Sequence, residues 1–247
     1  MAELEIQNLS FAYEDTDVIR NVNLTLHDRE IVCLLGTSGG GKTTVFNLIA
    51  GLLYPREGKV LLNGTDITGT SGQISYMLQK DLLLPYRTIE DNVILPLLVR
   101  HVPKKDAREA AGPLFAEFGL EGTQKKYPHQ LSGGMRQRAA FLRTYLFSGE
   151  AALLDEPFSA LDTMTKGDMH KWYLGVMEKL PVSTLFITHD IDEAITLSDR
   201  VYILSGKPGT ITGEVKIDCP KNERKDFALT GNFLEYKKQI LGLLGRK

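Results

Sequence analysis

The chain has 247 residues, enough for one large domain, and its 43% hydrophobic and 24% charged residues are ordinary proportions for a globular protein. The formal net charge of -2, from 29 Lys+Arg against 31 Asp+Glu, gives no electrostatic reason to expect nucleic acid as a partner. Two cysteines make no disulfide framework, and no apolar run approaches the roughly 18–20 residues that cross a bilayer. We therefore expect a cytoplasmic protein that would reach a membrane only through another subunit.

The N-terminal part alternates apolar and polar residues over 4–9 and again over 18–26, as half-buried strands do. Ile31–Leu35 is continuously apolar, which is typical of a strand buried on both faces. A glycine-rich segment follows at once, and Lys42–Leu53 then has the composition of a helix. The order is strand, glycine-rich loop and helix.

Between about residues 85 and 148 the pattern changes to helices, most clearly at Asp106–Phe118 and Gly134–Tyr145. No good strand lies between those two helices. We interpret residues 85–148 as a helical subdomain inserted into an α/β core made of about residues 1–84 and 149–247. The whole chain, 1–247, then forms a single nucleotide-binding domain.

Short apolar strands and helical segments alternate in the last third of the chain, which implies parallel βα units. The expected elements are strands at Ala151–Leu154, Thr184–Thr188 and Val201–Leu204, with helices at Thr163–Leu180 and Ile191–Ser198. The tail predicts an amphipathic helix, which either packs on the core or binds a partner; its apolar residues are Phe233, Tyr236, Ile240 and Leu243.

The glycine-rich segment reads Gly-Thr-Ser-Gly-Gly-Gly-Lys-Thr, which fits the phosphate-loop pattern G-x-x-x-x-G-K-[ST]. Such a loop lets backbone N–H groups point at phosphate oxygens, and the helix that follows adds its dipole. Lys42 would supply charge to the β- and γ-phosphates, and Thr43 would offer a hydroxyl to Mg²⁺. The chain is therefore predicted to have a P-loop NTPase core that binds ATP through Gly36, Thr37, Ser38, Gly39, Gly40, Gly41, Lys42, Thr43 and Thr44.

Asp155 and Glu156 end the apolar run that starts at Ala151, so they lie at the carboxyl edge of a predicted parallel strand. Open α/β sheets bind their ligands at that edge. Asp155 would hold Mg²⁺, through water, and Glu156 would orient or polarise the attacking water. By itself an Asp-Glu pair after a strand is common, and the phosphate loop is what gives it meaning.

Residues 131–138 read Leu-Ser-Gly-Gly-Met-Arg-Gln-Arg, which resembles the signature of ATP-binding cassette (ABC) ATPases. Taken alone, Ser132, Gly133 and Gly134 form either an anion-binding helix start or an ordinary N-cap. The resemblance covers roughly residues 3 to 215. It implies a head-to-tail homodimer, or pairing with a related ATPase, in which Ser132 to Gly134 of one subunit cap ATP held by the other.

The resemblance also implies roles for four further positions. His189 matches the switch histidine near the γ-phosphate, and Gln79 matches the glutamine that reaches Mg²⁺ and the attacking water. Tyr13 matches the aromatic residue that stacks on adenine, with Phe11 as a competing candidate that we expect to face the core. Ser159–Asp162 matches the loop that crosses the dimer interface. The catalytic set is then Glu156, His189 and Gln79, and the metal set is Thr43, Gln79 and Asp155.

The segment Leu83–Val93 is similar to ATPases of importers for nitrate, sulfonates, taurine and thiamine precursors, although Tyr86 replaces the usual Trp. Ser205–Ile211 also resembles that group. This likeness implies separate integral-membrane permease subunits, an extracytoplasmic solute-binding protein, and a position on the inner face of the cell membrane. The sequence names no solute. The alternative is a soluble ABC-type ATPase without a role in transport.

Alternatives within and outside this superfamily are less consistent with the chain. Translation factors carry two cassettes and DNA-repair members carry a long coiled-coil insertion, whereas this chain shows one cassette and no heptad insertion. A P-loop kinase would need neither the Leu-Ser-Gly-Gly segment nor a switch histidine. The run Gly39–Gly41 departs from the usual Gly-x-Gly, and we expect it to reduce order in the empty loop.

Overall fold

The computed structural model describes residues 3–148, 151–180, 182–220 and 223–245, and its strands form two sheets. In the smaller sheet, β1 (Leu4–Tyr13) pairs antiparallel with β2 (Thr16–Leu26) and with β4 (Glu57–Leu62), which also pairs with β5 (Thr65–Asp66). The predicted N-terminal antiparallel part is therefore confirmed. The apolar faces expected from the alternation are buried, at Leu4, Ile6, Leu9, Val22, Leu24 and Leu26.

The larger sheet has the strand order β10-β9-β3-β8-β7-β6. Five of its strands run parallel, and only β10 pairs antiparallel with its neighbour. Every residue of β3, β7 and β8 is buried, which is why these strands read as continuous apolar runs. The bounds are β3 (Ile31–Gly36), β6 (Ser75–Met77), β7 (Ala151–Asp155), β8 (Ser183–Thr188), β9 (Arg200–Ser205) and β10 (Thr210–Lys216).

One predicted helix ends at a different residue and one strand was not predicted, each for a local reason. The helix expected at Lys42–Leu53 is α1 (Lys42–Ile49) and ends four residues earlier, because Gly51 adopts a φ of 69° and closes the helix. β10 was not predicted as a strand. It is an edge strand with Val215 as its buried residue, so its sequence lacks the apolar run that marks the inner strands.

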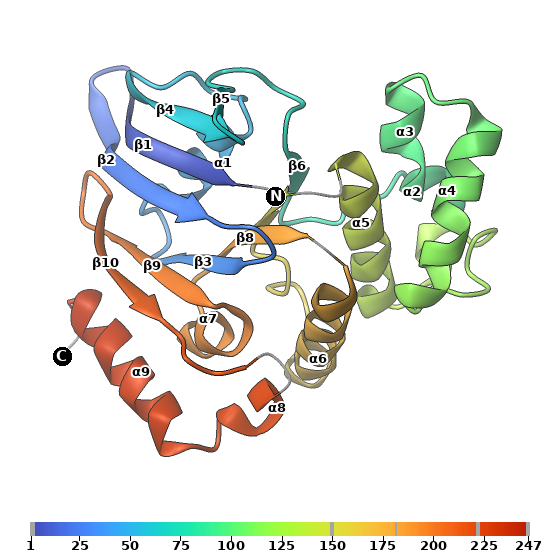
Figure 1. The fold of residues 1–247 in the computed structure, drawn as a ribbon. Helices are drawn as coiled ribbons and strands as arrows, with labels where there is room; N and C mark the ends of the chain where they lie inside the picture. Colours follow the sequence, from blue (N-terminus) through green and yellow to red (C-terminus); the bar gives the residue numbers. More distant parts are fainter. Residues whose placement is uncertain (1–2, 149–150, 181, 221–222, 246–247) are drawn as a thin grey trace.

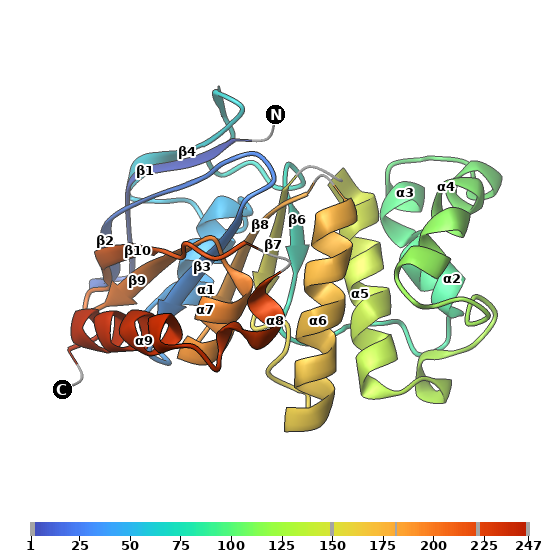
Figure 2. The ribbon, with the colours of Figure 1, turned by 60° about the horizontal axis from the view of Figure 1, so that its bottom comes forward.

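Helices lie on both sides of the larger sheet and beside it. Between β6 and β7 the chain forms α2 (Ile89–Val93), α3 (Leu95–Val99), α4 (Lys104–Glu117) and α5 (Gly133–Ser148). Figures 1 and 2 show α2, α3 and α4 gathered next to α5, at the opposite side of the molecule from β10. Helices α2 to α5 therefore lie beside the larger sheet, next to its β6 and β7 side.

The C-terminal half supplies α6 (Thr163–Lys179), α7 (Ile191–Leu197), α8 (Arg224–Phe227) and α9 (Gly231–Leu243). In α9, Phe233 and Ile240 are buried in the same apolar cluster as residues of β3 and α7. The tail helix therefore packs on the core of its own chain, which confirms the first of the two readings. Among the described residues, no helix combines the length and apolar character that spanning a membrane requires.

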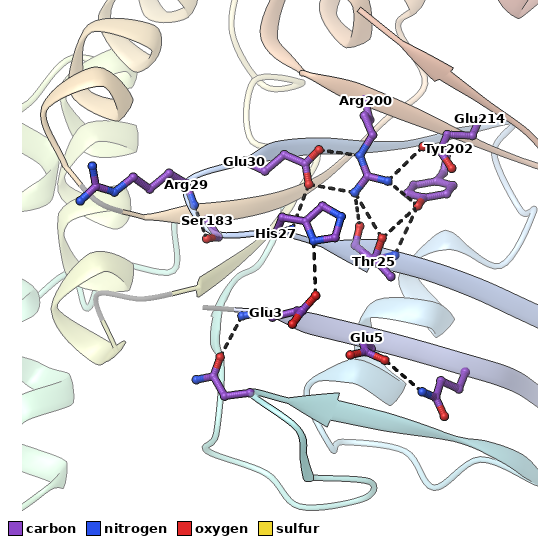
Figure 3. Close-up of polar contacts among 12 residues, drawn as sticks. Glu3, Glu5, Thr25, His27, Arg29, Glu30, Ser183, Arg200, Tyr202 and Glu214 are labelled. Atoms are coloured by element: carbon purple, nitrogen blue, oxygen red, sulfur yellow. Dashed lines mark hydrogen bonds and ion pairs between the residues drawn. The ribbon is translucent and has the colours of Figure 1, made fainter. Parts of the chain in front are cut away.

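An ion-pair network at the amino ends of β3 and β9 joins the two sheets. The guanidinium of Arg200 binds both carboxylate oxygens of Glu30, and it also donates to the Thr25 carbonyl at 2.8 Å and to Glu214 Oε1 at 3.0 Å (Figure 3). The side chains of Arg200 and Glu30 are each only 13% exposed. Hydrogen bonding to Glu30 raises the pKa of Arg200 despite burial, so this cation stays charged.

Replacing Arg200 with Met should test how much this network stabilises the fold. The variant leaves the Glu30 carboxylate buried without its cation, so we expect a loss of about 3 kcal/mol in the free energy of unfolding. Urea unfolding followed by circular dichroism measures it. Arg20→Met is the matched control, because Arg20 pairs with Asp17 at the surface and should change stability by no more than about 1 kcal/mol. Equal losses of stability in the two variants would show that the buried Arg200–Glu30 pair stabilises the fold no more than a surface ion pair does.

Candidate nucleotide-hydrolysis site

The site lies where three parallel strands end at the same edge of the larger sheet. Leu35 of β3 stands beside Thr188 of β8, and Asp155 of β7 stands beside Ile187. The phosphate loop, Glu156 and His189 directly follow these strand ends. The register of β3, β8 and β7 therefore places three sequence-distant segments side by side, as the parallel reading requires.

The phosphate loop needs glycine at two of its three consecutive glycine positions. Gly39 and Gly41 have φ values of 76° and 92°, in the left-handed region, whereas Gly40 has no positive φ. A Cβ on Gly41 would also lie 2.6 Å from Ile19 Cγ2. Gly40 thus stands at an ordinary backbone position and adds only conformational freedom to the loop.

Lys42 and Asp155 face each other across the mouth of this loop. The Lys42 ammonium donates to the carbonyls of Gly36 at 2.9 Å and Thr37 at 3.0 Å, and the side chain is nearly buried. Burial lowers the pKa of Lys42, while the charges of Glu156 and Asp155 oppose that shift. Burial likewise raises the pKa of Asp155, against the hydrogen bond from Thr43. Both groups lie where extra charge of the opposite sign would stabilise them.

The donor set at this point fits a phosphate group with a hard divalent cation. Thr43 Oγ1 lies 3.2 Å from Asp155 Oδ2, so two oxygens of the kind that Mg²⁺ prefers are adjacent. A cavity of about 420 Å³ opens beside them. It is lined by Val18, Ser38, Gly39, Gly41, Lys42, Thr43, Thr44, Gln79, Asp155 and Glu156.

The three predicted catalytic side chains, Glu156, Gln79 and His189, form one cluster with Glu156 in the middle. Its Oε2 accepts a hydrogen bond from Gln79 Nε2 at 3.2 Å, and its Oε1 lies 3.1 Å from His189 Nδ1. Its backbone N–H donates to the Ile187 carbonyl at 3.1 Å, and its φ is 45°. Ser159 Oγ lies 3.4 Å from Gln79 Nε2, which adds the predicted interface loop to the same cluster.

Tyr76 is a member of the site that the sequence did not point to. Its hydroxyl lies 3.4 Å from Asp155 Oδ2 and 3.3 Å from Asn47 Oδ1 of α1. Burial and the Asp155 charge both raise the pKa of Tyr76, so it stays a neutral donor toward that carboxylate. A tyrosine in a three-residue edge strand carries no pattern by which it could have been found.

The aromatic candidates separate as expected. Phe11 packs against the apolar cluster between the two sheets, and Tyr13 is 50% exposed at the end of β1. Their rings meet edge to face with centroids 4.8 Å apart. Tyr13 does not line the 420 Å³ cavity, so its stacking on adenine stays a prediction.

The signature residues lie apart from the phosphate loop of their own chain. Ser132 is exposed and immediately precedes α5, where its Oγ accepts a hydrogen bond from the Met135 N–H at 3.3 Å. Ser132, Gly133 and Gly134 are absent from the described residues that line the 420 Å³ cavity. Gly133 instead lines a second cavity of about 660 Å³, together with Glu156 and His189. Within one chain, the signature residues therefore do not line the cavity at the phosphate loop, although Gln79 and Glu156 line both cavities.

Residues 19–159 match the family model described as ABC transporter. The chain belongs to the ABC transporter family. It is 42% identical over 246 residues to the formylaminopyrimidine import ATP-binding protein ThiZ of Halalkalibacterium halodurans, covering 98% of this chain and 96% of that protein. It is 36% identical to the nitrate import ATP-binding protein NrtD of Synechocystis sp., covering 92% and 87% of the two chains. This ABC protein is an ATPase, and its likeness to the nitrate and thiamine-precursor group is confirmed.

A solved structure supports the fold of this ABC ATPase. The dimeric structure of a bacterial ABC transporter cassette superposes with a TM-score of 0.73 at 28% identity, covering 88% of this chain and all of that one. The predicted α/β fold, with a parallel sheet and an antiparallel part, is confirmed. That cassette is a dimer.

Gly40 and Gly41 differ in backbone conformation, so replacing each with alanine tests whether the phosphate loop needs glycine at the left-handed position. Gly41→Ala should weaken ATP binding on the order of tenfold or more, because the left-handed backbone and the contact with Ile19 both resist a Cβ. Gly40→Ala should keep near-normal affinity, since its φ is not in the left-handed region and its Cβ would meet only atoms of Thr37, the carbonyl oxygen at 3.1 Å and Oγ1 at 3.7 Å. Titration with a fluorescent ATP analogue measures both. Comparable losses of ATP affinity in the two variants would show that the left-handed backbone at Gly41 is not what the loop requires.

Proposed function

We propose that two copies of this chain, or this chain and a related ATPase, close head to tail on ATP and hydrolyse it to drive solute import. The observation that carries the proposal is the separation of the half-sites. The Glu156 carboxylate is held by Gln79 and His189 beside the phosphate loop, whereas the Ser132 helix start lies outside that cavity. A second copy can supply the missing half.

Each residue of the site has a task that its position supports. Lys42 would give up its bonds to the Gly36 and Thr37 carbonyls and donate to phosphate oxygens. Thr43, Asp155 and Gln79 would hold Mg²⁺, which would supply positive charge against the phosphate oxygens. Glu156 would accept a hydrogen bond or proton from the attacking water, and His189 would hold that carboxylate in place.

The partner's Ser132, Gly133 and Gly134 would bind the outer face of the triphosphate through their helix start. Tyr13, exposed at the end of β1, would stack on adenine. The loop Ser159–Asp162 would meet the second copy. Hydrolysis removes the phosphate bridge between the copies, so the dimer reopens.

We also propose the division of this single domain, 1–247, into a core of about 1–84 and 149–247 and a helical subdomain of about 85–148. A groove of about 270 Å³ runs between the two parts. It is lined by the end of α1, by α3 and by α5, through Ala50, Leu52, Gly72, Ile74, Tyr76, Pro96, Arg143, Thr144 and Phe147. Its apolar lining suits a short segment of an integral-membrane permease subunit, which would place the chain on the inner face of the cell membrane.

The relatives' names support an importer with an extracytoplasmic solute-binding protein. Formylaminopyrimidine and nitrate are the solutes that those names print, and we propose a small solute of that group, which also includes taurine and sulfonates. The alternative, a soluble ABC-type ATPase outside transport, differs in one respect that can be tested. It would have no permease to bind.

Glu156→Gln should separate ATP binding from hydrolysis. The amide keeps the size of the side chain but cannot take a proton, so hydrolysis should fall about 100-fold or more while ATP affinity is retained. The ATP-bound variant should then accumulate as a closed dimer, which analytical ultracentrifugation detects. Adding Ser132→Arg should abolish that dimer, because the new side chain fills the exposed helix start. A Glu156→Gln protein that hydrolyses ATP at the wild-type rate would remove Glu156 from its proposed role.

The transport role is tested by capture of a permease. If a multi-span permease is encoded beside the gene for this chain, the wild-type chain coexpressed with it should copurify with that subunit in detergent. Leu52→Glu places a charge in the apolar groove and should abolish capture while ATP binding persists, because Leu52 is 58% exposed and does not line the cavity at the phosphate loop. Leu229→Glu is the matched control, at an exposed leucine outside the groove. Capture of Leu52→Glu as efficient as that of the wild type would remove the groove as the docking surface, and failure to capture even the wild-type chain would favour the soluble alternative.

A further inference from the structure

A single ammonium group joins the starts of α6 and α7. α6 is capped by Asp162, whose side chain accepts from the Thr165 N–H at 3.1 Å, and Lys166 lies in its first turn. α7 is capped by Asp190, whose Oδ1 accepts from the N–H groups of Asp192 at 3.0 Å and Glu193 at 3.2 Å. Lys166 Nζ reaches across to Asp190 Oδ2 at 2.7 Å and to Glu193 Oε2 at 2.8 Å.

The three charged groups form a compact and largely buried cluster. The Glu193 side chain is 3% exposed and that of Lys166 is 22% exposed, whereas Asp190, at 39%, lies at the solvent side of the cluster. Burial raises the pKa of Glu193, and the hydrogen bond from Lys166 opposes that shift. Burial also acts to lower the pKa of Lys166, but its bonds to Asp190 and Glu193 outweigh it and raise the value. Without Lys166, two carboxylates would face each other with no cation between them.

The cluster is connected to the catalytic residues through the chain segment Thr188–Asp190. Asp190 follows His189 in the chain, and its N–H donates to Thr188 Oγ1 at 3.1 Å, so fixing the Asp190 side chain fixes the backbone that carries His189. His189 Nδ1 in turn lies 3.1 Å from Glu156 Oε1. On the other side, α6 begins immediately after the loop Ser159–Leu161, which lines the 660 Å³ cavity with Glu156 and His189.

We propose that Lys166 is a positioning residue for ATP hydrolysis: its ammonium, shared by Asp190 and Glu193, holds the His189 segment in register with the Ser159–Asp162 loop. This proposal rests on the proposed function. It assigns to Lys166 no contact with nucleotide, water or metal. Its effect on the reaction runs through the placement of His189 against Glu156, where a displacement of about 1 Å is enough to slow catalysis strongly.

A buried ion pair that served only folding would behave differently. Arg200 and Glu30 form such a pair at the amino ends of the strands, whereas the site lies at their carboxyl ends. Loss of either cation leaves a buried carboxylate without its partner and should lower the melting temperature. Only loss of Lys166 should alter the turnover of protein that is still folded.

The experiment compares Lys166→Met, Lys166→Arg and Arg200→Met at a temperature where each is folded by circular dichroism. In Lys166→Met, kcat should fall about tenfold or more while ATP affinity changes by no more than about twofold. Lys166→Arg should recover most of the lost kcat, because a guanidinium can bind the same two carboxylates. Arg200→Met should lose thermal stability and keep its kcat.

A double variant covers the case in which Lys166→Met does not fold. Lys166→Met with Glu193→Gln removes the ammonium and the buried carboxylate together, so the pair leaves no deeply buried charge unpaired. It should fold and should still show the reduced kcat. An unchanged kcat in either folded variant, or an arginine variant as slow as the methionine variant, would overturn the positioning role. Wild-type protein without ATPase activity would instead refute the proposed function itself.

Discussion

The common end of three parallel strands is the constraint on which this molecule's chemistry depends. β3, β8 and β7 are each buried over their whole length, so their polar continuations can emerge only at the strand ends. The register brings Gly36, Asp155 and Thr188 to one edge. There the Lys42 ammonium and the Asp155 carboxylate are both poorly solvated, and the pKa of each is moved by burial toward the neutral form. A triphosphate with its metal ion supplies the two charges that would reverse both shifts.

Glu156 shows how the fold uses backbone strain at this edge. A φ of 45° is unfavourable for a residue with a side chain, at a cost on the order of 1–3 kcal/mol. The strained turn takes Glu156 out of the strand direction while its N–H still bonds to the Ile187 carbonyl. The side chain is thereby directed between Gln79 and His189 and into both cavities. A relaxed residue continuing β7 would point to a face of the sheet, so the strain has a functional counterpart.

The sequence predicted those features whose information is local. The phosphate loop lies between a strand and a helix within one short stretch, and continuous apolar runs mark β3, β7 and β8. Contacts between distant residues could not be read in the same way. Gln79 and Glu156 are 77 residues apart in the sequence. Only the resemblance to ABC ATPases predicted that both belong to one site. Lys166 was not singled out, because one lysine on an exposed-looking helix carries no pattern; its partners Asp190 and Glu193 become visible only when α6 and α7 are placed side by side.

The starts of α1 and α5 bear on the proposed pairing of two copies of the chain. Neither α1 nor α5 carries an acidic residue in its first turn, although both helices have polar glycine-rich approaches that leave backbone N–H groups directed outward. α7, by contrast, offsets that positive pole with Asp192 and Glu193. A bound anion would be stabilised at either start, and the start of α5 is not among the residues that line the cavity at the phosphate loop of its own chain. In the proposed head-to-tail dimer, one triphosphate lies between α1 of one copy and α5 of the other and neutralises both poles. The nucleotide then holds the copies together only as long as its phosphates remain linked, so the same charge balance that closes the dimer makes it sensitive to hydrolysis.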